Sequence, residues 1–309
     1  MQPARRDLLK AVALAAVPVR AAAERYQLGC QTLPYQALPL ARAIEGIQKA
    51  GYRYVMPYAR HAREAVFTPA LTPAARAELR RRFQDAGLTP FMAFAGLGTE
   101  PRNQEGVDKY NAELDLCADL GIRMTVGAGP WYYKKWPNIP TRTRDWLPIC
   151  DQFYGGLEKV VRHAESIGVT IALKPHTGIT ANARACMEVV KRIPSERLKI
   201  CWDAGNVSFY EGIWPDPDLP DLAPNVKAVC IKDHRGLRGE ANFPVPGQGQ
   251  IDHEDMFRTL FAGGFSGPLA VERVDGTDKA AAMPAELIDE RIAAARRHLE
   301  PLLEKTARG

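Results

Sequence analysis

The sequence lacks any Cys-x-x-Cys pair, although it contains six cysteines. A structural zinc ribbon needs thiolates at that spacing, so this class of metal site is excluded. Several cysteines lie inside apolar, strand-like runs, where a thiol behaves as a small apolar side chain. A disulfide is not required by this pattern, and we leave it open for an oxidising compartment.

The sequence also lacks an apolar run long enough to cross a bilayer, so no stable membrane insertion is expected. Its first 23 residues instead predict a twin-arginine signal peptide: the pair Arg5-Arg6, a short apolar run over 11–19 and the small residues Ala21-Ala22-Ala23 follow in the required order. The protein is therefore expected in the periplasm. A cytosolic protein with an alanine-rich N-terminus is the alternative.

Strong positive charge is missing as well once the leader is set aside. Residues 1–23 carry four basic side chains and one acid, so their removal lowers the formal net charge from +5 to +2. A mature chain this close to neutrality gives no reason to expect nucleic acid as a partner.

No linker or low-complexity segment divides residues 24–309, which favours one domain. Apolar strand-like runs alternate with helical patterns, and glycines mark several helix ends. The strands are expected at 26–32, 52–58, 89–95, 123–128, 169–174, 198–203, 226–233 and 269–273. Helices are expected at 74–86, 107–120, 154–166, 181–192, 254–262 and 285–304.

Eight strand–helix units without a second pattern predict a single (β/α)8 TIM barrel rather than an open doubly wound sheet. Two connections, 129–147 and 234–250, are unusually long. Both follow strands, so both should overhang the face on which barrel enzymes carry their active sites.

Two carboxylates close apolar strands. Glu272 follows the run Pro-Leu-Ala-Val, and Asp203 follows Lys-Ile-Cys-Trp. Strands covered by helices are apolar on both faces, so a charge at the end of one belongs to the rim. The sequence therefore predicts that these acids meet at one mouth of the barrel.

Four motifs carry a family resemblance that spans the mature chain. In chain order they are Gly-Val-Thr-Ile-Ala-Leu-Lys-Pro-His ending at His176, Lys-Ile-Cys-Trp-Asp-Ala-Gly-Asn ending at Asn206, Val-Lys-Ala-Val-Cys-Ile-Lys-Asp ending at Asp233, and Gly-Phe-Ser-Gly-Pro-Leu-Ala-Val-Glu ending at Glu272. The chain resembles the xylose isomerase-like TIM barrel family of sugar-phosphate isomerases, epimerases and dehydratases.

The resemblance implies a divalent metal held by a Glu, an Asp, a His and a Glu on the fifth to eighth strands. Asp203 and Glu272 match this pattern. The first Glu position corresponds to Lys174 and the His position to Cys230, while Asn206 stands where a histidine is often found. The usual ligand set is therefore altered in this chain.

Strand periodicity suggests a replacement set. Residues two apart on a strand point the same way, so His176 should follow Lys174 inward, and His234 should follow Cys230 and Lys232. We expect His176, Asp203, His234 and Glu272 to bind a divalent metal, with Mn²⁺ favoured and Zn²⁺, Co²⁺ or Fe²⁺ as alternatives. A metal-free site, in which the histidines bind substrate or loop backbone, remains open.

Lys174 and Glu272 are the expected catalytic pair. An ammonium at the position of a family carboxylate could replace the metal as the charge that stabilises an enediolate, or act in acid–base catalysis. A structural salt bridge and Schiff-base chemistry are the alternatives for Lys174. For substrate binding we expect Trp131 and Tyr132 by stacking, and Asn206, Lys232 and Arg235 through polar contacts.

These features predict an isomerase or epimerase that moves a proton next to a carbonyl in a sugar, keto-sugar, polyol or cyclitol. No glycine-rich phosphate loop is evident, which favours an unphosphorylated substrate. A lyase that eliminates from oxidised glycosides and a non-catalytic carbohydrate-binding barrel are the alternatives. Assembly into a homo-oligomer is left open.

Overall fold

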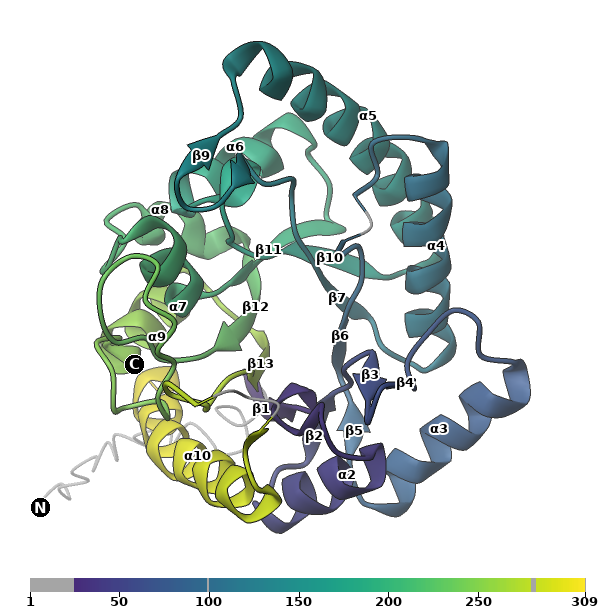
Figure 1. Ribbon diagram of the computed structural model, residues 1–309, viewed down its shortest axis with the longest axis vertical. Coiled ribbons are helices and arrows are strands. Elements are labelled where there is room, and N and C mark those ends of the chain that lie inside the picture. The colour runs from purple at the N-terminus through teal and green to yellow at the C-terminus, as the bar shows by residue number, and fades with distance from the viewer. Residues whose placement is uncertain (1–24, 99, 279–281, 309) are drawn as a thin grey trace, which may run out of the picture.

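The computed structural model describes residues 25–98, 100–278 and 282–308, so the leader expected at 1–23 lies outside the described residues. One sheet of parallel strands curls around the centre of the molecule, and helices surround it (Figure 1). The sheet order is β5-β2-β1-β13-β12-β11-β10-β7-β6. Its strands are β1 (Tyr26–Gln31), β2 (Tyr54–Met56), β5 (Thr89–Pro90), β6 (Met92–Phe94), β7 (Met124–Gly127), β10 (Thr170–Leu173), β11 (Leu198–Trp202), β12 (Val226–Ile231) and β13 (Gly267–Val271).

The barrel closes through the third predicted strand, which is divided into β5 and β6. The first part pairs with β2 and the second with β7, so the two ends of the printed sheet order belong to one segment, residues 89–94. Pro90 within it has no backbone N–H to donate to a neighbouring strand. The expected single (β/α)8 barrel is confirmed.

Helices follow the strands along the outside of the barrel (Figure 1). All six predicted helices appear with their ends shifted, and the long connection after the fourth predicted strand is helical from Thr143 onward. The sixth unit is different, because β11 leads into short helical turns rather than one long helix. The longer helices are α2 (Leu40–Lys49), α3 (Pro73–Asp85), α4 (Gln104–Asp119), α5 (Thr143–Ile167), α6 (Ala183–Arg192), α9 (His253–Ala262) and α10 (Ala285–Ala307).

Several short elements lie on the face of the barrel at the carboxyl ends of the strands. They include the hairpins β3–β4 (Arg60–His61 and Glu64–Ala65) and β8–β9 (Tyr133–Lys135 and Ile139–Pro140). After β11 come α7 (Ala204–Asn206) and a π-helical turn η3 (Val207–Glu211) on this face. The chain then forms α8 (Leu219–Leu222), which packs against α6 and α9 and leads back to the start of β12. None of the helices between residues 25 and 308 that the structure describes combines the length and apolar character needed to cross a bilayer.

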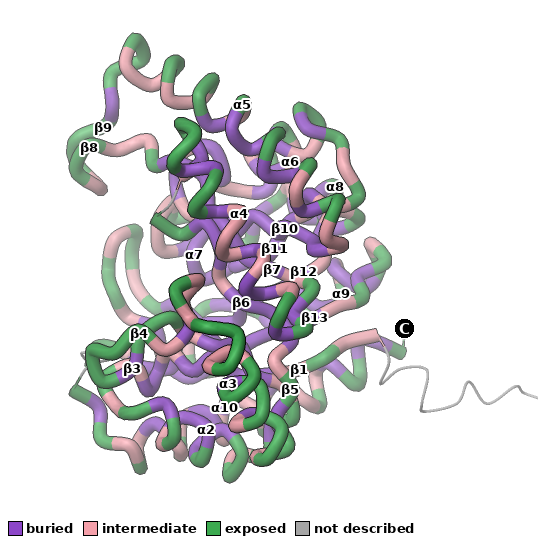
Figure 2. The backbone as a smooth tube through the Cα atoms, turned by 90° about the vertical axis from the view of Figure 1, so that its right-hand side faces the viewer, coloured by how far each residue is buried: buried purple, intermediate pink, exposed green. Residues whose placement is uncertain are grey.

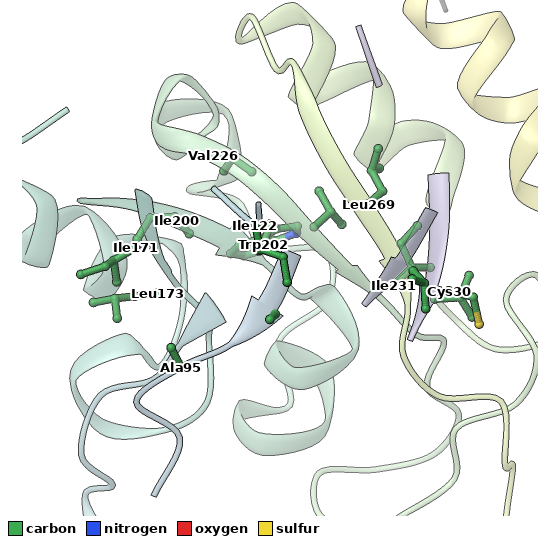
Figure 3. Packing of buried hydrophobic residues seen from close by; sticks show 14 of the residues in the cluster. Cys30, Ala95, Ile122, Ile171, Leu173, Ile200, Trp202, Val226, Ile231 and Leu269 are labelled. Carbon is green, nitrogen blue, oxygen red and sulfur yellow. The ribbon is translucent and has the colours of Figure 1, made fainter. Parts of the chain in front are cut away.

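Alternation along the strands creates two apolar layers. Outward residues such as Trp202 and Leu269 pack beneath the helices (Figure 3), and Figure 2 shows the buried strands inside a more exposed helical shell. Trp202 is fully buried, as its phase relative to Asp203 predicts. Inward residues form a second, smaller cluster that fills the barrel below the site: Met56, Phe91, Met92, Val126, Ala172, Cys201, Ala228, Cys230 and Ala270.

Candidate active site

Four charged side chains converge just beyond the carboxyl ends of neighbouring strands. Lys174, Asp203, Lys232 and Glu272 follow β10, β11, β12 and β13, and all four are at least 94% buried, with exposures of 6% or less. Each lies two residues beyond an inward-facing member of the inner apolar cluster, so strand alternation aims it at the barrel axis. The sequence expectation that Lys174, Asp203 and Glu272 meet at one mouth agrees with this geometry.

Lysines and carboxylates alternate within this cluster. Lys174 Nζ lies 2.9 Å from both carboxylate oxygens of Glu272 and 3.3 Å from Asp203 Oδ2. Lys232 Nζ lies 3.0 Å from the same Asp203 oxygen and 3.2 Å from Glu272 Oε2. Two ammonium groups therefore bridge two carboxylates, which gives the cluster a balanced formal charge.

Asn206 ties this cluster to the backbone. Lys232 Nζ donates to the side-chain oxygen of Asn206 at 2.9 Å, and the side-chain amide of Asn206 donates to the Pro175 carbonyl at 2.7 Å. The Asn206 backbone N–H donates to Asp203 Oδ1 at 2.9 Å, so Asp203 also caps the turn that follows β11. The ammonium group of Lys232 and the carboxylate of Asp203 are thus held in place before any ligand binds.

Charge pairing decides the protonation states of the cluster. Burial alone would lower the pKa of Lys174, but the carboxylates of Glu272 and Asp203 outweigh it and hold that pKa well above its usual value. Burial would raise the pKa of Glu272, yet Lys174 and Lys232 together lower it. At neutral pH Lys174 is an ammonium ion and Glu272 a carboxylate.

The cluster forms the floor of a cavity of about 380 Å³. That volume is within the range of small-molecule sites. Polar groups line its base and aromatic rings its walls, a combination suited to the polar edges and apolar faces of a sugar ring. The lining includes Tyr58, Phe94, Lys174, His176, Asn206, Tyr210, Lys232, Phe243, Glu272 and Arg273.

His176 lines the same cavity. Its ring packs 4.9 Å from Tyr210 and 5.6 Å from Trp131, measured between ring centroids. Burial, reinforced by the nearby lysines, holds its pKa well below the usual value, so the imidazole is neutral at pH 7. Its Nδ1 atom is buried without a hydrogen-bond partner, which leaves it available to a bound ligand.

Three described residues could share one metal ion, because Asp203, Cys230 and Glu272 each place a ligand atom within 4.8 Å of the others. Both carboxylates are already paired with ammonium groups, however. Burial, and a hydrogen bond between the Cys230 thiol and Cys201, raise the pKa of Cys230 well above its usual value. A metal needs deprotonated, unpaired ligands, so the residues as placed do not fit a divalent cation.

The expected ligand set of His176, Asp203, His234 and Glu272 does not form among the described residues, since the group of candidate ligands contains neither histidine. His234 is fully buried elsewhere: its Nδ1 lies 2.8 Å from Ser208 Oγ and its Nε2 2.9 Å from the Glu240 carbonyl oxygen. The expectation that residues two apart point the same way does not apply to His234, because β12 ends at Ile231, three residues earlier.

The expected substrate-binding residues divide into two groups. Asn206 and Lys232 line the cavity, and Trp131 lines a neighbouring one that it shares with His176. Tyr132 instead packs edge-on against Trp146 in the first turns of α5, with 5.2 Å between ring centroids. Arg235 is exposed and donates to the Gln248 carbonyl, so neither of these two lines the cavity, contrary to the expectation.

Sequence reasoning missed several residues of the cavity wall. Tyr58 and Phe94 follow inward residues of β2 and β6 by two positions, so the alternation that located Lys174 could also have found them. Tyr210 lies on the π-helical turn η3, which no sequence period indicated. Arg273 stacks on Phe243, with its guanidinium carbon 3.9 Å from the ring centroid.

Asp233 anchors the long loop that follows β12. Its carboxylate accepts hydrogen bonds from the backbone N–H groups of His234, Gly247, Gly249 and Ile251 at 2.8 to 3.1 Å. Charged acceptors make stronger hydrogen bonds than neutral ones. One buried side chain thus holds both ends of the 234–250 loop beside the cavity.

Residues 44–300 match the family model described as xylose isomerase-like TIM barrel. Among curated relatives, an inosose dehydratase from Clostridium beijerinckii is 30% identical over 226 residues, which cover 62% of this chain and 70% of the relative. A fructoselysine 3-epimerase from Escherichia coli O157:H7 is 23% identical over 261 residues, covering 80% of this chain and 90% of the relative.

Solved structures with the same fold include a xylose isomerase domain protein from Planctomyces limnophilus, with a TM-score of 0.68 and 19% identity over 86% of this chain and 94% of that chain. A D-psicose 3-epimerase from Clostridium cellulolyticum H10, solved with D-tagatose, has a TM-score of 0.70 and 18% identity over 90% of this chain and 99% of that chain. At these identities the likeness shows the fold.

Proposed function

Because the chain belongs to the xylose isomerase-like TIM barrel family, we propose that it moves a proton at a carbon next to the carbonyl of a small sugar, keto-sugar or cyclitol. Its relatives and structural neighbours include sugar epimerases, and the chain is an isomerase/epimerase-like enzyme. The proposal adds the reaction step and the residues that perform it.

The observation that supports this proposal best is the buried lysine–carboxylate cluster at the floor of the cavity. A carbon acid next to a carbonyl loses its proton only if the negative charge that develops on oxygen is stabilised. Lys174 and Lys232 supply two fixed positive charges. Glu272 supplies a carboxylate that accepts the proton when the substrate oxygen replaces it beside the ammonium groups, because loss of those contacts removes the cause of its lowered pKa. Both requirements of enediolate chemistry are thus within one pocket.

In the proposed step the substrate carbonyl oxygen approaches the two ammonium groups, and Glu272 takes the proton from the adjacent carbon. The electron pair of the broken C–H bond forms a carbon–carbon double bond, and the π electron pair of the carbonyl group moves onto its oxygen, where the lysines stabilise the charge. Return of the proton to another carbon or to the other face completes an isomerisation or an epimerisation. The neutral imidazole of His176 is placed to hydrogen-bond a substrate hydroxyl during this exchange.

Two sources of positive charge were expected from the sequence: a divalent ion, Mn²⁺ above all, or the ammonium group of Lys174 in its place. This scheme takes the second and adds Lys232. The reason is the fit of the residues: Asp203 and Glu272 are neutralised by ammonium groups, and Cys230 is held as a thiol. Lys174 is held protonated, so its role is electrostatic rather than that of a Schiff-base nucleophile.

A lyase reaction is a second candidate, favoured by the 30% identity to a protein named inosose dehydratase. Loss of water or of another group uses the same first step as epimerisation. The outcome depends on whether the carbon next to the enediolate carries a leaving group. The same site residues therefore serve both reactions, and the products distinguish them.

Solvent exchange tests the proposal. In D₂O, the protein should introduce deuterium at the carbon next to the carbonyl of an accepted substrate from a panel of ketoses, keto-glycosides and inososes, followed by NMR. Glu272→Gln keeps the shape of the side chain but cannot accept a proton, so exchange should slow by about 10² to 10⁴. Glu290→Gln, an exposed change on α10, is the matched control and should exchange normally.

Undiminished exchange in Glu272→Gln would show that the base lies elsewhere on the rim. Tight binding of panel sugars without any exchange or elimination by the unaltered protein would instead support the carbohydrate-binding alternative.

A further inference from the structure

A second cavity, of about 300 Å³, adjoins the active-site cavity. It lies between the β3–β4 hairpin with its flanking loop and the segment that follows β6. The proposed proton transfer uses none of the side chains found only in this second cavity. Its size is at the lower end of the range for small-molecule sites, which is enough for one ring.

The walls of this cavity are mostly apolar. Phe67 and Leu116 are buried, and Pro57 and Pro69 complete the apolar surface. The carboxylate in the lining, Glu113, accepts a hydrogen bond from the Gly96 backbone N–H at 2.6 Å. Arg60 also lines this cavity, so both signs of charge are present in its wall and neither sign dominates. An uncharged apolar ring would bury its surface against the apolar part of the wall.

The two cavities share part of their lining. Tyr58, Phe94 and Leu97 line both of them. Phe94 also connects this wall to the chemistry, because Lys174 Nζ lies 5.1 Å from the centroid of its ring. Leu97, 37% exposed, adds an apolar side chain where the two cavities meet. A ligand that reaches Lys174 and bears a further ring can extend past these residues into the second cavity.

We propose that the second cavity binds the aglycone of the substrate, and that the substrate is a keto-glycoside with an apolar, aromatic aglycone. This inference rests on the proposed function for the part of the substrate that contacts Lys174 and Glu272. The anomeric carbon of a glycoside is blocked by its aglycone, so the reacting carbonyl lies on another ring carbon. A free ketose would leave the second cavity empty.

Binding of matched glycosides tests this inference without any need for turnover. Phenyl and methyl β-D-glucopyranoside, and the corresponding pair of galactopyranosides, are titrated into the full-length protein by calorimetry. Burial of the phenyl ring predicts that a phenyl glycoside binds at least about 10-fold more tightly than its methyl partner. Phenol alone should bind far more weakly, because it makes no contacts in the sugar cavity.

Ala65→Trp supplies the decisive variant. Ala65 is exposed on β4 and lines the second cavity, so a larger side chain there fills the space without disturbing the core. The phenyl preference should disappear in Ala65→Trp, while affinity for the methyl glycoside stays within about twofold. Ala70→Trp, an exposed residue of the same loop outside the cavity lining, is the matched control and should retain the preference.

Equal binding of phenyl and methyl glycosides, a preference that survives Ala65→Trp, or no binding of either phenyl glycoside would overturn the aglycone assignment. These outcomes are separate from those of the exchange experiment. If exchange proceeds on free ketoses while no phenyl preference exists, the proposed function stands and the aglycone site fails. If the phenyl preference exists but no sugar exchanges a proton, the second cavity is an aglycone site of a binding protein.

Discussion

Lys174 is the residue that distinguishes this site. Its position corresponds to a carboxylate in the family pattern, and in the structure its ammonium group contacts both Asp203 and Glu272. Such a pair can be a structural lock or a reactive group. Removal of one partner from a buried ion pair leaves an uncompensated charge, so a loss of activity alone could reflect damage to the fold. A measurement that depends on the charge of Lys174 and not on stability is needed to distinguish a structural from a catalytic role.

The Lys174→Met variant distinguishes a structural from a catalytic role of Lys174. Loss of the ammonium should lower turnover by about 10² to 10³, because one of the two charges that stabilise the enediolate is gone. It should also raise the pKa of Glu272, which Lys174 and Lys232 hold low, so the acidic limb of the pH–rate profile should move to higher pH. Rates measured between pH 4 and 8 test this.

Lys227→Met, on strand β12 and away from the cavity lining, is the control for Lys174→Met and should leave the profile unchanged. A folded Lys174→Met protein with an unshifted acidic limb would assign Lys174 a purely structural role.

The site could be predicted only in part, at the positions where strand geometry still applies. Lys174 and Glu272 directly follow buried strands by one residue, and alternation placed both. His234 lies three residues beyond β12, where the chain has turned and the period no longer holds. Lys232 was expected to bind substrate, but its contact with both carboxylates depends on distances between strands that one sequence does not give.

At the scale of elements, helix packing contributes an acid sensitivity through His253. This side chain opens α9 and is buried, with its ring centroid 5.8 Å from that of His298 on α10. Burial, with a smaller contribution from His298, lowers the pKa of His253 to about 4, although Asp233 and Asp252 partly oppose the change. The packing of α9 against α10 therefore requires a neutral imidazole.

The sign of the effect follows from this depressed pKa. An unfolded chain binds the proton below about pH 6.5, but the folded protein does not bind it until the pH approaches 4. The free energy of unfolding should then fall by roughly 1.4 kcal/mol per pH unit within that window. His253→Phe should reduce the loss of stability between pH 7 and pH 5 by about 2 kcal/mol, measured by urea unfolding. An unchanged loss would mean that other groups cause the acid sensitivity.

At the scale of the whole molecule, the barrel was predictable because eight apolar strands and their helices repeat one pattern. The exceptions have local causes: the third strand divides near Pro90, and the unit after β11 uses short turns whose contacts are made with distant loops. The α5 helix also begins earlier than its apolar pattern indicates, at Thr143.

Export is a further proposal at this scale, supported by Arg5-Arg6 and Ala21-Ala22-Ala23. Replacement of both arginines by lysine should retain the precursor in the cytoplasm, because the twin-arginine pathway reads this pair. Fractionation of cells and N-terminal sequencing of the mature protein, expected to begin near Glu24, provide the measurement. Unaltered protein found in the cytoplasm with Met1 still present would refute the leader assignment.

The central claim is that two buried lysines, rather than a metal ion, stabilise the charge formed by proton abstraction. Deuterium exchange into an accepted substrate, measured with the native protein after exhaustive chelation and with its metal content determined on the same sample, tests it most directly. We predict that exchange continues at an unchanged rate with less than about 0.05 equivalents of metal, since Lys174 and Lys232 already neutralise Asp203 and Glu272. Loss of exchange on chelation, with recovery on addition of Mn²⁺, would contradict the account.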